Sequence, residues 1–302
     1  MTQVLQGVGV ALQADALIAL RRVALAAKAD PVLAALPGGI STRRKGHGLE
    51  VADKREYVAG DDLRHLDRGA TARTGRLHIR QFQEERDRVT LLIADFRPAM
   101  FWGISRAFRS VVAAEALAMI GWNVVEAGGR VGLLAVTPGD PVIVPARARV
   151  RGMLDVIGGM VQAHCTGLDM LMAGQGDSNL RLDQSLARVE RIAPAGAELV
   201  LASGFDAPGD GLPDRLDALA QRRDPQLVLI TDAQATRLPR GRYPIRLPDG
   251  GRTKVYLRGP TSAPREILAQ IAGRQALVLD GADKVEDMAR HIAASFAGAR
   301  AT

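Results

Sequence analysis

Short apolar runs alternate with longer amphipathic stretches along most of this chain. The run from Val89 to Ala94 ends at Asp95, and a short continuous apolar run of this kind is typical of a central strand covered on both faces. Further strands are predicted at 131–136, 142–144, 199–202, 227–230 and 276–279. Helical spacing of apolar residues predicts helices at 14–27, 105–127, 153–161, 182–192, 212–220, 264–272 and 285–297.

The order of these elements predicts an α/β fold, with a doubly wound, mostly parallel sheet and helices on both faces. The turn sequence Thr137–Pro141 joins two of the strands into a hairpin, which places one antiparallel strand at an edge of the sheet. A second hairpin is predicted near 243–257, and we expect it to form a small β side sheet with a strand at 76–82.

We expect two parts along the chain. Residues 1–86 would hold an N-terminal helix and a charged segment packed on the main domain, and the stretch from Asp30 to Arg73 has an irregular pattern. Residues 87–302 would form the α/β domain, with the hairpin near 243–257 as an insertion.

Charge and composition narrow the classes of function. The chain has 40 Lys and Arg against 33 Asp and Glu, a net charge of +7, but its basic residues are scattered and only 4% of residues are aromatic. This scatter favours a solvated surface over a phosphate-binding face, and nucleic-acid binding stays as the alternative function. The single cysteine, Cys165, excludes an internal disulfide and a cysteine zinc cluster. Without an apolar run of membrane-spanning length, we expect a soluble, cytoplasmic protein with no membrane span.

Motifs that carry known chemistry are missing from the sequence. There is no G-x-x-x-x-G-K-[ST], G-x-S-x-G or H-E-x-x-H pattern, and the five histidines are dispersed. Ligands of open parallel sheets bind beyond the carboxyl ends of the strands, where Asp95, Ser178 and Ser203 could offer oxygens to Mg²⁺. A metal-dependent hydrolase that uses Asp95 and Asp232 is the weakest of the possible functions.

The most distinctive stretch runs from Gly46 to Arg86. Asp61 is placed to cap a short helix, and Arg64 and Asp67 then lie one helical turn apart and can pair. The guanidinium groups of Arg55 and Arg73 are suited to carboxylates. Two interpretations remain open: an ion-pair network that holds an irregular segment, and a charged docking surface for another protein.

The spacing of residues in this stretch resembles a bacterial family of uncharacterised proteins with a von Willebrand factor A-like domain, associated with MoxR-type AAA+ ATPases. The matching positions are Gly46, Gly48, Glu50, Arg55, Tyr57, Gly60, Asp61, Asp62, Arg64, Asp67, Ala72, Arg73, Leu77, Ile79, Arg80, Phe82, Glu85 and Arg86. The resemblance implies a von Willebrand factor A-like fold. It also implies a non-enzymatic adaptor or scaffold that works with such an ATPase and a client protein and needs no cofactor.

Domains of this type often hold a metal-ion-dependent adhesion site with a D-x-S-x-S motif, a threonine and a second aspartate. Here Asp95 is kept, but Arg97 and Ala99 replace the serines, Ser178 stands for the threonine, and Gly204 takes the place of the later aspartate. We therefore expect a degenerate site that has lost its cation. Arg97 either places a permanent positive charge where the metal would sit or points to solvent.

The resemblance also suggests which residues contact a partner. These are Arg55, Tyr57, Asp61, Asp62, Arg64, Asp67, Arg73 and Arg97.

Overall fold

The computed structural model describes residues 7–29, 50–58, 66–83, 88–104, 106–175, 180–233, 238–246, 252–257 and 267–297. These belong to two compact units, a larger one that contains residues 1–41 and 89–301 and a smaller one that contains residues 42–88. The boundary between residues 88 and 89, where the smaller unit ends, lies close to the predicted one at residue 86. The N-terminal helix, however, belongs to the larger unit.

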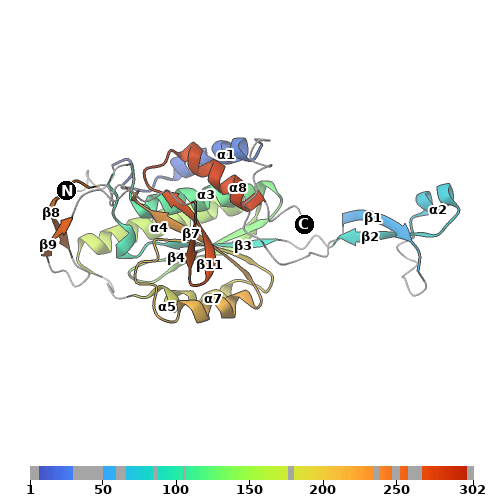
Figure 1. Cartoon of the computed structure of the whole chain (residues 1–302). Helices are drawn as coiled ribbons and strands as arrows, with labels where there is room; N and C mark the ends of the chain where they lie inside the picture. Colours follow the sequence, from blue (N-terminus) through green and yellow to red (C-terminus); the bar gives the residue numbers. More distant parts are fainter. Residues whose placement is uncertain are drawn as a thin grey trace. The chain divides into compact units, whose positions relative to one another are not determined.

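A seven-stranded sheet forms the centre of the larger unit (Figure 1), in the order β10-β11-β7-β6-β3-β4-β5. Its strands are β3 (Val89–Asp95), β4 (Arg130–Val136), β5 (Val142–Ala148), β6 (Glu198–Ser203), β7 (Asp224–Thr231), β10 (Leu268–Ile271) and β11 (Arg274–Asp280). The five inner strands are parallel, and β5 and β10 are antiparallel to their neighbours at the two edges. The carboxyl ends of the inner strands therefore meet at one edge of the sheet, where a ligand site is expected.

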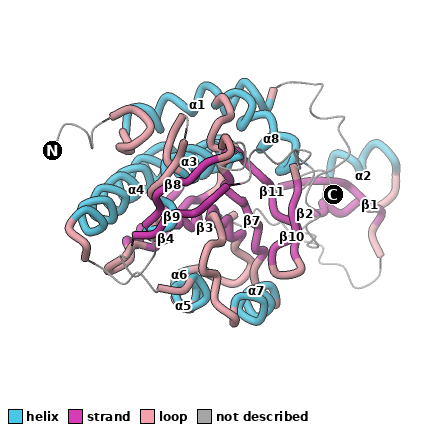
Figure 2. Tube along the Cα trace, turned by 60° about the vertical axis from the view of Figure 1, so that its left-hand side comes forward, coloured by secondary structure: helices cyan, strands magenta, loops and turns pink. Residues whose placement is uncertain are grey.

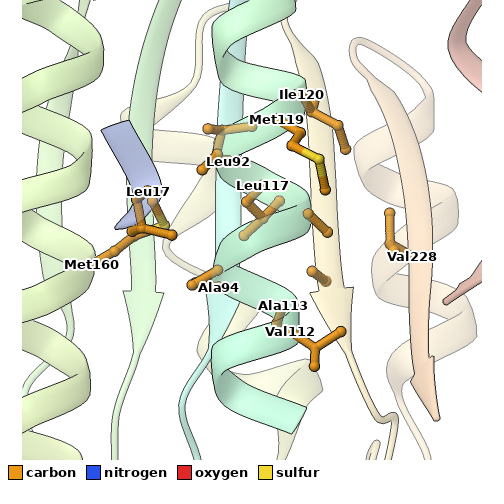
Figure 3. Packing of buried hydrophobic residues seen from close by; sticks show 14 of the residues in the cluster. Leu17, Leu92, Ala94, Val112, Ala113, Leu117, Met119, Ile120, Met160 and Val228 are labelled. Carbon is orange, nitrogen blue, oxygen red and sulfur yellow. The ribbon is translucent and has the colours of Figure 1, made fainter. Parts of the chain in front are cut away.

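Helices cover both faces of this sheet (Figure 2). One face carries α3 (Arg109–Glu126), α4 (Arg149–Met172), α8 (Val285–Ala297) and α1 (Ala14–Lys28), and the other carries α5 (Leu182–Leu186), α6 (Val189–Ile192) and α7 (Leu212–Ala220). Alternate side chains of β3 serve the two faces: Leu92 and Ala94 pack with α3, as Figure 3 shows, and Leu91 and Ile93 pack with the other layer. Burial on both faces explains why these strands are continuous apolar runs.

One predicted helix is a β-hairpin in the structure. Residues 264–272 were expected to be helical, but β10 and β11 form an antiparallel pair joined at Ala272 and Gly273. Both of these residues have positive φ, 50° and 74°, as a two-residue hairpin turn of the I′ type requires. The sheet consequently has two antiparallel edge strands, and the prediction of a single one was wrong.

The predicted side sheet pairs differently from the expectation. The hairpin near 243–257 is confirmed as β8 (Gly241–Arg246) and β9 (Arg252–Leu257), but these strands pair with each other alone. In the smaller unit, β2 (His78–Gln83) pairs instead with β1 (Glu50–Glu56), and α2 (Arg68–Thr74) lies between them in sequence. Within the described part of the stretch from Asp30 to Arg73, the expected irregular pattern was wrong for β1 and α2, because the charged residues of β1 hide its strand character.

Among the described residues, no helix combines the length and the apolar character that crossing a membrane requires.

Candidate functional site

The candidate site lies at the carboxyl edge of the main sheet, around the aspartate that ends β3. Asp95 is almost fully buried, and its carboxylate accepts four hydrogen bonds. The backbone N–H and the Nε–H of Arg97 donate to Oδ1 over 3.0 and 2.9 Å, and Nη2 of Arg97 and the hydroxyl of Ser203 donate to Oδ2 over 2.8 and 2.6 Å. The sequence prediction that Asp95 and Ser203 come together is confirmed, since β3 and β6 are adjacent parallel strands.

Arg97 donates every N–H group of its guanidinium inside the chain. Besides the two bonds to Asp95, Nη1 donates to the carbonyl oxygens of Leu180 and Ala207, and Nη2 donates to that of Asp206, each over 3.0 Å. A guanidinium has five N–H donors, so none remains without a partner. Arg97 thereby ties two segments of the chain, at Leu180 and at Asp206–Ala207, to the end of β3.

The burial of Arg97 decides between the two expectations for this residue. Its exposed fraction is 3%, so it does not point to solvent, and its guanidinium carries a fixed positive charge directly beside the Asp95 carboxylate. Arg97 was also expected to contact a partner, and in this structure its side chain faces the interior.

The residues at this position do not fit a magnesium ion. Mg²⁺ needs a nearly octahedral set of oxygen ligands about 2.0–2.1 Å away. Both Asp95 oxygens are already occupied by donors, and the guanidinium of Arg97 would repel a cation. Within the part of the chain that the structure describes, no three His, Cys, Asp or Glu side chains are grouped as metal ligands. Ser178, the third oxygen predicted from the sequence, lies outside the described residues.

A second arginine lies at the same edge, at the first position of α3. The Arg109 side chain is 6% exposed and pairs through Nη2 with the Asp206 carboxylate, which is 47% exposed. The guanidinium carbon lies 5.1 Å from the centre of the Trp102 ring, which is a cation–π distance. Gly204 makes this position possible, because a Cβ atom there would lie 1.2 Å from Nη2 of Arg109.

The loop after β6 has an unusual backbone that presents Asp206. Phe205 and Ala207, on either side of it, have φ values of 53° and 46°, in the left-handed region that non-glycine residues seldom adopt. Hydrogen bonds hold the loop in this shape: the Ser203 hydroxyl accepts from the backbone N–H of Phe205 over 2.9 Å, and Arg97 holds the carbonyls of residues 206 and 207. The backbone of Asp206 is therefore anchored while its side chain reaches Arg109.

Two further carboxylates, one directly after β7 and one at the last residue of β11, accept hydrogen bonds from the loop backbone. Asp232 accepts a hydrogen bond from the N–H of Ile104 over 2.7 Å, and Asp280 accepts from the N–H groups of Ala233 and Ala282 over 3.0 and 2.9 Å. These contacts fix the loops at the carboxyl edge.

His164 forms a buried pair with a serine beneath the same edge. Its Nε2 lies 3.0 Å from the Ser110 hydroxyl, and its ring packs against Phe96 and Phe101 at centroid distances of 5.3 and 5.0 Å. Burial lowers the pKa of His164 to about 4, so the imidazole is neutral at physiological pH. The neighbouring Cys165 is exposed whereas His164 is fully buried, so the two do not share one environment as a nucleophilic pair would.

The charged motif of the smaller unit is described in part. Asp67 caps α2 by accepting a hydrogen bond from the N–H of Ala70 over 2.8 Å, and Gly75 ends that helix with a φ of 71°. The backbone N–H of Tyr57 donates to the carbonyl of Leu77 over 2.8 Å, and Arg73 is exposed. Arg55 lies in β1, and its side chain is outside the description. Asp61, Asp62 and Arg64 lie outside the described residues, and with them the predicted short helix.

Sequence reasoning missed the pairing of Arg109 with Asp206 and that of Ser110 with His164. The partners are far apart along the chain, and no motif links them. Gly204 was the available signal, because a glycine at the end of a buried strand marks a place where another group approaches closely.

Comparisons with known proteins place the chain among uncharacterized bacterial proteins. The model of the family described as "Protein of unknown function DUF58" matches residues 53–277, which is more than half of the chain. The uncharacterized protein Mb1516 of Mycobacterium bovis is 30% identical over 198 residues, as are the uncharacterized proteins MT1527 and Rv1480 of Mycobacterium tuberculosis. Each alignment covers 64% of this chain and 58% of the relative's own length. On the strength of the family match, this chain belongs to the DUF58 family.

Proposed function

We propose that this chain is a non-enzymatic protein-interaction module with a von Willebrand factor A-like domain, in which an arginine has replaced the cation of a metal-ion-dependent adhesion site. It would act as an adaptor or scaffold between a MoxR-type AAA+ ATPase and a client protein. The observation that carries the proposal is the Asp95–Arg97 pair, in which the guanidinium takes the place that a cation would need.

The architecture supports this proposal. The inner strands are parallel, the central strand β3 ends in the aspartate, and the β4–β5 hairpin supplies an antiparallel edge strand, as the resemblance implies. Ser203 follows at the end of the neighbouring strand, and Gly204 takes the place of a further carboxylate. The carboxyl edge thus keeps a rigid frame while lacking the oxygen ligands of a metal site.

The surface charges also support a protein partner over a nucleic acid. Several arginines of the larger unit are paired with carboxylates, among them Arg106 with Glu115, Arg147 with Asp155 and Arg215 with Glu190. Paired arginines release few counterions on a phosphate backbone, so they contribute little to nucleic-acid affinity.

The loss of the cation is tested by calorimetry. Titration of the full chain with MgCl₂ and with MnCl₂ should give no binding heat above dilution. A Kd in the micromolar range that disappears in Asp95→Ala would refute the proposal.

The partner is tested by co-purification. The tagged full chain is expressed together with a MoxR-type ATPase from the same genome, with and without ATP, and retained ATPase is quantified. Co-elution that survives EDTA is the expected result. Failure to retain the ATPase in either nucleotide state would refute the adaptor role.

A further inference from the structure

The Arg109 side chain is buried, but most of its hydrogen-bonding capacity is unused. Within the described residues Asp206 is its one hydrogen-bond partner, and the Nε–H is buried without any acceptor. Arg97, twelve residues earlier in the chain, has acceptors for all five of its guanidinium N–H groups. A buried donor without an acceptor costs roughly 1–3 kcal/mol, so an additional acceptor at Arg109 would be favourable.

The surroundings of Arg109 favour an acidic group. It occupies the first position of α3, an 18-residue helix whose N-terminal end favours negative charge and whose N-cap residue, Phe108, offers no side-chain cap. Because Gly204 has no side chain, the Arg109 guanidinium occupies the space that a Cβ atom at this position would take. A planar guanidinium fork binds a carboxylate through two parallel hydrogen bonds.

The neighbouring surface indicates that the acidic group belongs to a protein. Trp102, whose ring lies against the Arg109 guanidinium, and Ile104, two residues after it in the chain, are 37% and 43% exposed although both are large and apolar. Exposed aromatic side chains beside an arginine are typical of the energetically important centre of protein interfaces. A free phosphate would make no use of them.

We propose that Arg109 is the binding site for an aspartate or glutamate side chain of a partner protein, and that Asp206 occupies this site in the free chain. The proposal rests on the interaction role proposed above and assigns its contact point. Asp206 is suited to be displaced, because its backbone is fixed by Arg97 while its half-exposed carboxylate can turn to solvent. The partner carboxylate then takes over the guanidinium and packs beside Trp102.

The test uses Trp102 as a reporter in the full chain. The other tryptophan, Trp122, is buried and donates its Nε1–H to the carbonyl of Leu17, so Trp122→Phe leaves one indole, next to Arg109. In this background the fluorescence of Trp102 is followed during titration with poly-L-glutamate at 150 mM NaCl. Inorganic phosphate is titrated separately.

Two aspartate variants separate the site from general charge attraction. Asp206→Ala removes the internal occupant, and Asp210→Ala removes the same charge from a fully exposed position in the same loop. If Asp206 fills the site about nine-tenths of the time, poly-L-glutamate should bind Asp206→Ala about tenfold more tightly than Asp210→Ala. Equal affinities for the two variants would overturn the proposal.

Variants of Arg109 provide the second readout. Adding Arg109→Gln or Arg109→Lys to Asp206→Ala should remove the gain in affinity for poly-L-glutamate, because neither side chain offers the guanidinium's fork of donors. Circular dichroism verifies that both double variants are folded. Retention of the gain in the folded variants would overturn the proposal, as would an equal response to inorganic phosphate. If Asp206→Ala gains affinity while the ATPase is not retained in co-purification, the adaptor role fails and the site stands. Equal binding of the two aspartate variants overturns the site whatever the ATPase does.

Discussion

Replacing Arg97 by alanine should produce a large loss of stability. The change removes all the side-chain hydrogen bonds of Arg97 and leaves Asp95 as a buried carboxylate whose remaining donors are the Ser203 hydroxyl and one backbone N–H. Breaking a buried ion pair by removing one partner costs about 3–5 kcal/mol, because the other charge stays uncompensated. Since a typical protein unfolds with about 5–15 kcal/mol, this is a substantial fraction of the total.

The assay is urea unfolding followed by circular dichroism, with Arg147→Ala as the matched control. Arg147 pairs with Asp155 over 2.9 Å, a distance close to the 2.8 Å of the Arg97–Asp95 pair, but both members of the Arg147–Asp155 pair are solvent-exposed. An exposed pair contributes at most about 1 kcal/mol. The two arginines therefore differ in burial and in the number of hydrogen bonds, and the control isolates these effects from the loss of an arginine as such.

A double variant provides the internal check. Asp95→Ala combined with Arg97→Ala removes both charges, so its loss of stability should be smaller than the sum of the two single losses by about 1–3 kcal/mol. If Arg97→Ala costs no more than Arg147→Ala, the pair does not hold the edge of the sheet together. The replacement of a cation by the Arg97 guanidinium would then have no energetic basis.

Three other predictions follow from buried or tightly packed positions. Burial lowers the pKa of His164 to about 4, so between about pH 6.5 and pH 4 the unfolded chain binds a proton that the folded chain does not. As the pH falls through this window, the free energy of unfolding should decrease by up to about 3 kcal/mol. Urea titrations of His164→Leu should show a weaker pH dependence, and an unchanged dependence would contradict the prediction. Gly204→Ala places a Cβ 1.2 Å from Nη2 of Arg109 and should destabilise the protein by about 1–3 kcal/mol. Gly158→Ala, in α4 with nothing within 4 Å of the new atom, should instead stabilise it by about 0.5–1 kcal/mol. Equal melting temperatures for the two variants would contradict this prediction. Burial raises the pKa of the Cys165 thiol, so iodoacetamide should modify it more slowly at pH 7 than it modifies free cysteine, and mass spectrometry that finds an equal rate would show the thiol to be unperturbed.

The main sheet could be predicted because its inner strands are buried on both faces. Runs such as those at 89–94, 199–202 and 227–230 have no polar alternation, and the structure places all three as inner parallel strands. The strand β1 and the edge strand β10 escaped prediction. Glu50–Glu56 is mostly charged, and Leu268–Ile271 is a short strand whose hairpin turn contains an alanine at positive φ, which no sequence rule favours.

The candidate site was predictable where its residues lie close together along the chain or directly at the carboxyl ends of recognisable strands, as Asp95 and Ser203 do. Asp95 and Arg97 are two positions apart at the end of a recognisable strand, so their proximity and the missing serines could be read from the sequence. The direction of the Arg97 side chain could not, because it depends on carbonyl oxygens from residues 180, 206 and 207. The Arg109–Asp206 pair depends on the packing of α3 against the end of β6, which only the tertiary structure supplies.

A positive charge carried by a side chain differs from a bound ion in how it can be regulated. Arg97 is present in every copy from the moment of synthesis, at a fixed one-to-one ratio to Asp95, and neither dilution nor a chelator can remove it. The positive charge beside Asp95 therefore does not vary with the concentration of divalent ions. Under the proposed function, control over what this edge contacts would act on groups at its rim or on the abundance of the protein itself.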